Sequence, residues 1–479
     1  MNVLRTPNQS LDPQIEVARA AFGLPYLYPY QRLVIANTIH PDEENPNQIV
    51  VLPTGSGKSL CFTLPALLVD GLTIVVYPLL ALMDDQLRRM TEASVPARIL
   101  RGGQSRCERS RIFAAARSGG VRCLLANPEV LGAESVRREL SGIRIGHLVV
   151  DEAHCVSEWG ETFRPSYLTL RETIAALSPR VVTAFTATAS PVVLDTVTRI
   201  LFDTERPRLV QGDPDRPNIS YSVVHAPSKE AALAELAGAG VERPALVFCR
   251  SRKRTEAVAR ELAEVVGFDR CSAYHAGLTK RERAAVEEWF FASDDGVLAA
   301  TCAYGMGVDK QNIRTVIHYE LPSNVEAFLQ ESGRAGRDRE LAWSIVLWNE
   351  SDQVREIEPG RAAREAVMRG YLRAEGCRRA YLMDALGTDS PVCFGCDRCT
   401  PGEEPHAVVR MRGTMQQAVE HANELARRRP RTFTADQFVH RLPLAWSTSA
   451  RQELLASLVA GGALGVHRRG PWKGRIHRV

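Results

Sequence analysis

Residues 52–60 read Leu-Pro-Thr-Gly-Ser-Gly-Lys-Ser-Leu, between an apolar run at 49–52 and a helical apolar pattern at 61–69. A strand, a glycine-rich turn and a helix in this order form the geometry that binds a triphosphate. The two glycines let backbone N–H groups face phosphate oxygens, and the N-terminus of the helix adds a positive dipole. We expect Lys58 to reach the β- and γ-phosphates and Ser59 to ligate Mg²⁺.

The stretch departs at one position from the usual phosphate-loop pattern, because Leu52 stands where that pattern has its first glycine. A Gly/Ser turn that only leads into a buried helix is therefore an alternative, which the rest of the chain has to decide. If the pattern holds, the loop residues that bind the nucleotide are Thr54, Gly55, Ser56, Gly57, Lys58 and Ser59.

The length and composition indicate a multidomain globular protein. A chain of 479 residues is too long for one core, and about two to four domains are expected. No apolar run approaches the length of a membrane span, and the N-terminal residues lack an apolar signal core. We therefore expect a cytoplasmic protein with no membrane partner.

The net charge of +4 is unevenly distributed along the chain. Residues 401–479 contain 13 Arg/Lys and 6 Asp/Glu, a net charge of +7, which leaves −3 for the preceding 400 residues. A basic end region on a near-neutral body suggests a polyanion as partner. A solvated charged surface is the alternative.

Short apolar runs alternate with amphipathic segments, and this alternation predicts α/β lobes with parallel sheets covered on both faces. In the first lobe we expect strands at 49–52, 73–77, 122–126, 147–150 and 181–185, and helices at 79–91, 105–117 and 129–140. Residues 205–218 are rich in Asp, Arg and Pro and are predicted to be a linker. In the second lobe we expect strands at 245–249, 272–275, 297–301 and 315–319, and helices at 252–266 and 279–292. Two lobes with one phosphate loop suggest a nucleotide held between them.

Two further motifs carry groups that suit phosphate chemistry. Asp151 and Glu152 follow the apolar run 147–150, and the end of such a strand reaches the ligand edge of an open α/β sheet. There Asp151 can hold Mg²⁺ and Glu152 can activate the attacking water. Arg334 and Arg337, near the end of the second lobe, would face the same way on a helix and could stabilise transition-state charge on the γ-phosphate. Salt bridges of this arginine pair with Glu331 and Asp338 are the alternative.

These motifs, in this order, resemble the two-lobed superfamily 2 helicases, and residues 21–399 resemble the RecQ family of DNA helicases. Phe22-Gly23 with Pro29-Tyr30-Gln31 is similar to the family's adenine-recognition motif, which implies that Gln31 and Tyr28 bind the base. Tyr28 stands where the family usually has Arg. Residues 183–189 resemble the motif that couples the lobes, and residues 215–218, 274–277 and 304–309 resemble second-lobe signatures.

The most specific resemblance is at residues 155–165, Cys-Val-Ser-Glu-Trp-Gly-Glu-Thr-Phe-Arg-Pro, directly after Asp-Glu-Ala-His. This stretch resembles the family's aromatic-rich loop, which links binding of single-stranded DNA to ATP hydrolysis. Trp159 and Phe163 offer faces for base stacking, and Arg164 offers a phosphate or stacking contact. Aromatic side chains that only pack under a surface turn are the alternative.

Four of the eleven cysteines, Cys377, Cys393, Cys396 and Cys399, cluster near the C-terminal end. Zn²⁺ prefers tetrahedral sulfur ligands, and closely spaced cysteines on a turn supply a rigid half-site. An iron–sulfur cluster is the alternative, and disulfides are not expected in a reducing compartment. The spacing resembles the zinc platform of the RecQ family, which implies structural Zn²⁺. The other seven cysteines are expected to be reduced, mostly core residues.

Residues 401–479 are expected to form a small winged-helix domain. Helical patterns at 414–428, 435–440 and 447–460 precede a glycine-rich basic hairpin. Such a hairpin would contact DNA phosphates. Its basic residues are Arg468, Arg469, Lys473 and Arg475. A helical cap with a frayed basic tail is the alternative.

We therefore expect an α/β protein with two tandem RecA-like parallel-sheet lobes, at 1–205 and 206–350. A helical zinc-binding subdomain at 351–400 and the winged-helix domain at 401–479 would follow. The resemblance implies an ATP-dependent DNA helicase that uses ATP, Mg²⁺ and Zn²⁺ and moves 3′-to-5′. Its expected substrates are single-stranded DNA and duplex with a single-stranded tail, in DNA repair or recombination, and a monomer is the expected state.

Two other functions remain as alternatives. An RNA-directed helicase would share the ATPase core, but the aromatic loop and the four cysteines argue against it. A DNA-binding scaffold with an inactive ATPase is opposed by the intact Lys58, by Asp151 with Glu152, and by the arginine pair.

Overall fold

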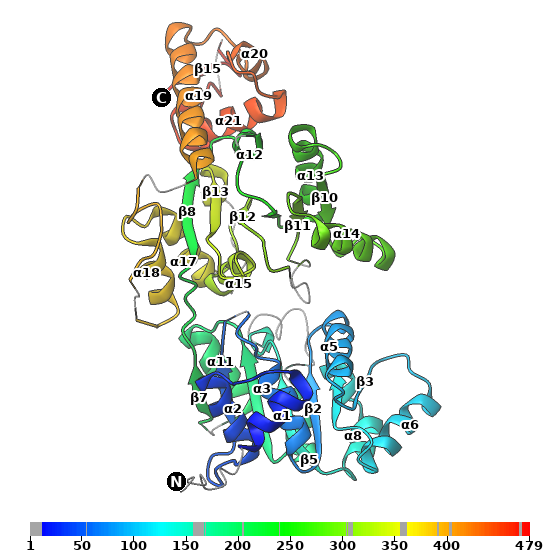
Figure 1. Ribbon diagram of the computed structural model, residues 1–479. Helices are drawn as coiled ribbons and strands as arrows, with labels where there is room; N and C mark the ends of the chain where they lie inside the picture. The colour runs from blue at the N-terminus through cyan, green and yellow to red at the C-terminus, as the bar shows by residue number, and fades with distance from the viewer. Residues whose placement is uncertain are drawn as a thin grey trace, which may run out of the picture. The chain divides into compact units, whose positions relative to one another are not determined.

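The computed structural model describes residues 12–53, 55–156, 167, 169–203, 206–238, 240–302, 304, 310–354, 362–389, 392–401, 405–468 and 472–479. The chain divides into two compact units, Met1–Pro214 and Asp215–Val479 (Figure 1). The first unit therefore extends beyond the boundary that we predicted at residue 205.

The first unit is built on a seven-stranded sheet in which all neighbouring strands are parallel. The strand order is β3-β4-β2-β5-β6-β1-β7. The strands are β1 Gln48–Val51, β2 Leu72–Val76, β3 Ala97–Leu100, β4 Cys123–Ala126, β5 Ile145–Val150, β6 Val181–Thr186 and β7 Arg208–Gln211. Five of them were predicted, whereas β3 and β7 were not.

Helices cover both faces of this sheet. In β1, Ile49 and Val51 enter one apolar cluster while Val50 enters another, as the two-residue period of a strand requires. The helices are α1 Pro13–Phe22, α2 Pro29–Ile39, α3 Leu60–Thr63, α4 Pro65–Leu68, α5 Leu80–Glu92, α6 Arg106–Arg117, α7 Pro128–Leu131, α8 Glu134–Leu140, α10 Leu170–Leu177 and α11 Pro191–Leu201. The helix predicted at 61–69 is divided into α3 and α4 at Pro65, because proline lacks the N–H group that a helix interior needs.

The linker prediction for 205–218 was wrong at residues 208–211, because these residues form β7 and pair with β1. Of the four residues in β7, only Val210 is buried. β7 is an edge strand, so its polar residues face away from the core and leave little apolar pattern in the sequence.

The second unit contains a six-stranded parallel sheet in the order β10-β11-β9-β12-β13-β8. The strands are β8 Ile219–His225, β9 Ala245–Phe248, β10 Cys271–Tyr274, β11 Val297–Ala300, β12 Thr315–His318 and β13 Ala342–Trp348. The helices of this part are α12 Lys229–Gly238, α13 Arg252–Val266, α14 Lys280–Ala292 and α15 Val325–Ser332. Both lobes are therefore α/β, as predicted, although β8, β13, α12 and α15 were missed.

Short helices and then a helical end region follow the second sheet. They are α16 Glu350–Val354, α17 Ala362–Arg373, α18 Arg378–Ala385, α19 His406–Arg428, α20 Ala435–Arg441 and α21 Thr448–Ala460. An antiparallel hairpin, β14 Leu464–Val466 with β15 Ile476–Arg478, ends the chain, and Thr434 forms a single antiparallel bridge with Arg475. Helix, bridge, two helices and a hairpin is the order of elements in a winged helix.

The end region packs against the second lobe. Figure 1 shows α19 and α21 next to α12, and side chains of all three helices belong to one apolar cluster. Met411 and Met415 of α19 and Ala450 of α21 are buried in that cluster. The Glu453 carboxylate of α21 accepts a hydrogen bond from the N–H of Glu230 in α12 at 3.1 Å. Helices α19 and α21 therefore contribute side chains to the core of the second lobe.

Over the described residues, none of the helices combines the length and the apolarity that a membrane crossing requires.

Candidate functional site

The glycine-rich loop connects β1 to α3, as the sequence predicted. Gly55 and Gly57 have φ values of +85° and +79°, a region that side chains with a Cβ rarely adopt. A Cβ on Gly57 would also lie 2.7 Å from Gln31 Nε2. Leu52, which replaces the first glycine of the usual pattern, is buried in the core, and its carbonyl accepts a hydrogen bond from Lys58 Nζ at 3.1 Å. Thr54 lies outside the described residues.

The predicted adenine-recognition residues contact this loop directly. Gln31 Nε2 donates to the Ser56 carbonyl at 3.2 Å, and the Tyr30 hydroxyl donates to the same oxygen at 2.9 Å. Gln31 Oε1 in turn accepts from the N–H of Tyr28 at 3.0 Å, and the Tyr28 ring stacks on Tyr30 with centroids 5.5 Å apart. The start of α2 therefore contacts the glycine-rich loop, and this loop ends at Ser59, which directly precedes α3.

The acidic pair lies at the carboxyl end of β5. Burial and the neighbouring Glu152 raise the pKa of Asp151 to about 7, while the positive charge of Lys58 acts in the opposite direction. Lys58 therefore lies close enough to Asp151 for its charge to act on this carboxyl group. A divalent cation there would favour the ionised carboxylate, because an opposite charge nearby lowers a carboxyl pKa.

Glu152 has a left-handed backbone conformation with φ of +51°, which for a residue other than glycine costs on the order of 1–3 kcal/mol. Its Oε2 lies 3.4 Å from Nδ1 of the buried His154, and the same nitrogen lies 3.1 Å from Thr186 Oγ1. Thr186 Oγ1 donates to the Thr188 carbonyl at 2.9 Å. The acidic motif is therefore joined to residues 183–189, which we predicted to couple the lobes.

Trp159, Phe163 and Arg164 of the aromatic loop lie outside the described residues. Their predicted role in DNA binding stays a prediction.

Arg334 and Arg337 lie in a turn that follows α15. The prediction that they share one face of a helix was therefore wrong. The helix ends at Ser332, and Gly336 in the turn has φ of +54°. A Cβ on Gly336 would lie 2.4 Å from Asn218 Nδ2, which explains the glycine at this position. Asp338 forms its ion pair with Arg314.

Residues of the 215–218 signature hold this arginine turn. Arg216 donates to the carbonyls of Gly333 at 3.2 Å, Ala335 at 3.2 Å and Gly336 at 2.7 Å. Asn218 Nδ2 donates to the Gly336 carbonyl at 2.8 Å. In the sequence this signature was identified only by its resemblance to a family motif, whereas its contacts in the structure hold the arginine turn. Arg216 and Asn218 fix the backbone that carries Arg334 and Arg337.

The four cysteines come together, with their sulfur atoms all within 4.8 Å of one another. Four thiolates around one Zn²⁺ need sulfur–sulfur distances of about 3.8 Å, as follows from Zn–S bonds of about 2.3 Å. Burial raises the pKa of the Cys396 thiol, but backbone N–H groups of Arg378, Arg398 and Cys399 outweigh that effect and lower the pKa below its usual value, whereas burial raises the pKa of Cys393 and Cys399. The spacing of the four sulfur atoms fits the donor set of a tetrahedral metal ion.

Comparison with known proteins identifies the family. The DEAD/DEAH box helicase model matches residues 28–196, and the helicase conserved C-terminal domain model matches residues 228–339. ATP-dependent DNA helicase RecQ of Pasteurella multocida is 32% identical over 400 residues, which cover 80% of this chain and 62% of that protein. The protein of the same name from Bacillus subtilis is 31% identical over 383 residues, 77% of this chain and 64% of that protein. The chain belongs to the RecQ family of superfamily 2 helicases.

This RecQ-family chain spans about three fifths of the length of these curated relatives. Among solved structures it resembles the DUF1998 helicase MrfA bound to DNA, with a TM-score of 0.59 and 19% identity over 99% of this chain and 60% of that chain. It also resembles the DEAD-box helicase Mss116 bound to ssRNA, with a TM-score of 0.59 and 16% identity over 93% of this chain and 90% of that chain. At these identities the likeness shows the two-lobed fold.

Two consecutive buried arginines connect the cysteine group of the RecQ-family chain to its second lobe. Arg378 binds Asp397 through Nε at 2.8 Å and Nη2 at 3.3 Å. Arg379 pairs with the buried Asp215 and donates to the Ile219 carbonyl at 2.6 Å. Cys396 also bridges to Tyr221 of β8. Residues next to the cysteines thus hold the edge strand and the start of the 215–218 signature.

Four basic residues of the hairpin were predicted to contact DNA. Of these, Arg468 and Lys473 are exposed, and Arg469 lies outside the described residues. Arg475 donates to the Thr432 carbonyl and forms the bridge with Thr434, so it holds the hairpin against the segment before α20.

Proposed function

We propose that this RecQ-family chain is an ATP-dependent DNA helicase, which couples ATP hydrolysis to movement along single-stranded DNA and to duplex unwinding. The observation that carries the proposal is the convergence of Lys58, Asp151 and the His154–Thr186 contact at the carboxyl ends of β1, β5 and β6. In open α/β sheets this edge is where nucleotides bind.

In the proposed ATP site the loop residues 54–59 bind the phosphates through their backbone N–H groups and Lys58. Ser59 and Asp151 hold Mg²⁺, which neutralises charge that develops on the phosphates. Glu152 orients the attacking water. His154 links it to Thr186, because its Nδ1 lies 3.4 Å from Glu152 Oε2 and 3.1 Å from Thr186 Oγ1. Gln31 and Tyr28 bind the base at the start of α2.

Arg334 and Arg337 contribute positive charge to the transition state of phosphoryl transfer. Support comes from the turn that carries them, since Arg216 and Asn218 hold its carbonyl oxygens in fixed positions. A fixed backbone reduces the conformational entropy that ordering these long side chains would cost.

The four cysteines bind structural Zn²⁺ and leave no coordination position of the metal open. The chain has the four functional parts predicted above, with the end of the first lobe moved to Pro214. The aromatic loop and the hairpin contact DNA. The protein moves along the strand in the 3′-to-5′ direction, and it acts in DNA repair or recombination in the cytoplasm. The names of the curated relatives, ATP-dependent DNA helicase RecQ, support DNA as substrate.

ATP turnover measured with different nucleic acids tests this proposal. We expect single-stranded DNA to raise the turnover number strongly and single-stranded RNA of the same sequence and length to raise it little. Stimulation by RNA alone would replace the proposal with an RNA-directed helicase. A rate of ATP turnover that neither nucleic acid changes would contradict coupling of ATP hydrolysis to DNA or RNA.

A further inference from the structure

Arg379, which lies two residues after Cys377, is fully buried and binds two sides of one turn in the second unit. This turn runs from Asp215 to Ile219, and the Ile219 N–H donates to the Arg216 carbonyl at 2.9 Å. Arg379 Nη1 donates to the same carbonyl at 3.1 Å. The guanidinium also pairs with the Asp215 carboxylate, and its Nη2 donates to the Ile219 carbonyl at 2.6 Å. One buried side chain therefore fixes both ends of the turn.

The side chain of Arg216 leads from this turn to the one that carries Arg334 and Arg337. It donates to three carbonyl groups of the second turn at distances between 2.7 and 3.2 Å. The backbone carbonyl of Arg216 is the oxygen that Arg379 binds. Arg379 therefore contacts directly the residue that holds the turn with the two arginines.

Arg216 needs such an anchor because it lies close to a like charge. Burial is the main cause that lowers the pKa of its guanidinium, and the positive charge of Arg337 lowers the pKa further, while Asp215 acts in the opposite direction. Two like charges that are partly removed from water repel each other. If the backbone at Arg216 were not fixed, this repulsion would move the turn that carries Arg337.

We propose that Arg379 is a positioning residue for ATP hydrolysis, which acts through Arg216 on the two arginines of the turn after α15. The inference rests on the proposed function of that arginine pair and adds to it a residue of the cysteine segment, residues 377–399. The side chain of Arg379 also interacts with the Cys393 sulfur, so it joins the cysteine group to the turn at Arg216. The cysteine segment then serves phosphoryl transfer as well as the stability of the second unit.

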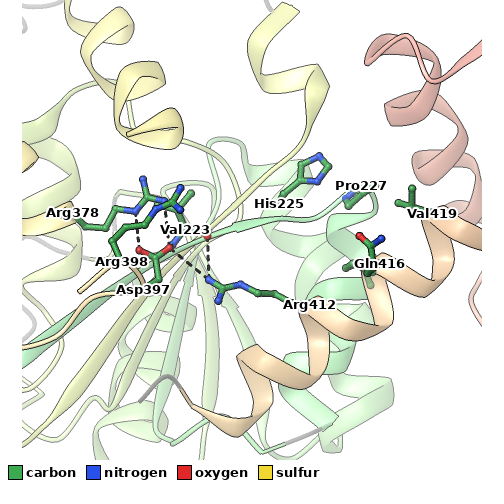
Figure 2. A pocket seen from close by; sticks show the side chains of 10 residues that line it. Val223, His225, Pro227, Arg378, Asp397, Arg398, Arg412, Gln416 and Val419 are labelled. Atoms are coloured by element: carbon green, nitrogen blue, oxygen red, sulfur yellow. Dashed lines mark hydrogen bonds and ion pairs between the residues drawn. The ribbon is translucent and has the colours of Figure 1, made fainter. Parts of the chain in front are cut away.

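The neighbouring Arg378 provides a matched control within the same segment. It is also buried and forms an ion pair, but with Asp397, to which it donates from Nε at 2.8 Å and from Nη2 at 3.3 Å (Figure 2). Asp397 in turn accepts a hydrogen bond from the N–H of Val223, in the middle of β8, at 3.1 Å. Loss of Arg378 should therefore cost stability, as loss of Arg379 does, but leave the turn at 215–219 in place.

The test measures steady-state ATP hydrolysis with single-stranded DNA present, at a temperature at which circular dichroism shows each variant to be folded. Arg379→Met should lower kcat at least about tenfold, because a misplacement of about 1 Å can cost on the order of 100-fold in rate. KM for ATP should stay within about twofold, since arginines that act in the transition state contribute little to binding of the ground state. Arg378→Met should leave both constants close to those of the wild type.

A second measurement separates positioning from a general loss of structure. In a background with Arg334→Ala and Arg337→Ala, Arg379→Met should lower kcat no further, because the side chains that it positions are gone. A residue with only a structural role would lower kcat by the same factor in both backgrounds. If Arg379→Met does not fold, Arg379→Lys serves in its place, because lysine keeps the charge beside Asp215 but lacks the fork that binds both carbonyls.

Zinc content and melting temperature are measured for every variant. The inference is overturned if Arg379→Met keeps the wild-type kcat, if Arg378→Met loses as much, or if Arg379→Met lowers kcat equally with and without the arginine pair. If the variant that lacks Arg334 and Arg337 hydrolyses ATP at the wild-type rate, the proposed function of the pair is wrong, and the inference is overturned with it.

Discussion

Arg379→Met removes the positive member of a buried ion pair in the second unit. Arg379 is 0% exposed, pairs with Asp215, and donates to the carbonyls of Arg216 at 3.1 Å and Ile219 at 2.6 Å. Methionine replaces much of the apolar volume but leaves the Asp215 carboxylate and both carbonyls without the guanidinium. We therefore expect the second unit to lose stability.

The size of the loss follows from these contacts. Removing one member of a buried ion pair costs about 3–5 kcal/mol, and each buried carbonyl that loses its donor costs roughly 1 kcal/mol more. Relaxation of the backbone offsets part of this sum, so we expect a decrease of about 4 kcal/mol in the free energy of unfolding. For a unit of this size, the melting temperature should fall by about 10 °C.

Urea and thermal unfolding, followed by circular dichroism, measure the effect. Arg427→Met is the matched control, because Arg427 makes an exposed ion pair with Glu424 at 2.7 Å, and exposed pairs contribute about 0–1 kcal/mol. Adding Asp215→Leu to Arg379→Met should recover part of the loss, since it removes the buried carboxylate. A stabilising role of the buried pair is excluded if Arg379→Met is as stable as Arg427→Met, or if the double variant is less stable than Arg379→Met alone.

Three further variants probe the cysteine group, the aromatic loop and the shared core. Cys396→Ser should lower bound zinc and the yield of folded protein, and metal analysis that finds iron, or no metal, in the wild type would reject the zinc assignment. Trp159→Ala should keep basal ATP turnover but lose its stimulation by single-stranded DNA, and a variant with normal stimulation would show that the tryptophan only packs under a turn. Truncation after Thr400 should yield an aggregation-prone protein, because it exposes the side of α12 that Met411, Met415 and Ala450 cover, and a soluble truncated protein that melts like the full chain would contradict the shared core.

The sequence predicted the features whose signal is local. Lys58, Asp151 and Glu152 each follow an apolar run closely, so an apolar strand and its polar end could be identified together. The cysteine group was equally accessible, because three of its four members lie within seven residues. These two sites account for most of the residues that we named in advance.

The features that escaped prediction depend on distant partners or on buried polar residues. Buried Ser220 and Ser222 interrupt the apolar pattern of β8, and the edge strand β7 buries only Val210. Arginine is almost never fully buried without a partner, so Arg379 could not be placed inside from sequence alone. Its partner Asp215 lies 164 residues away.

The contacts of the turn that carries Arg334 and Arg337 could not be predicted either, because they come from residues that are distant in the sequence. Gly333 and Gly336 are poor helix formers, but the groups that bind their carbonyl oxygens, Arg216 and Asn218, are more than 100 residues away in the chain. The sequence likewise predicted helices at 414–428 and 447–460, but not that α19 contributes buried side chains to the core of the second lobe.

Strand displacement from tailed duplexes, measured for the wild type and for Lys58→Ala, tests whether ATP turnover drives unwinding. We expect ATP-dependent displacement from a duplex with a 3′ tail and none from a duplex with a 5′ tail. Lys58→Ala should displace neither while it binds the 3′-tailed duplex within a few-fold of the wild type, because Lys58 lies at the nucleotide loop. Displacement by Lys58→Ala at the wild-type rate, or no displacement by a wild type that binds the duplex, would contradict unwinding driven by ATP at this loop.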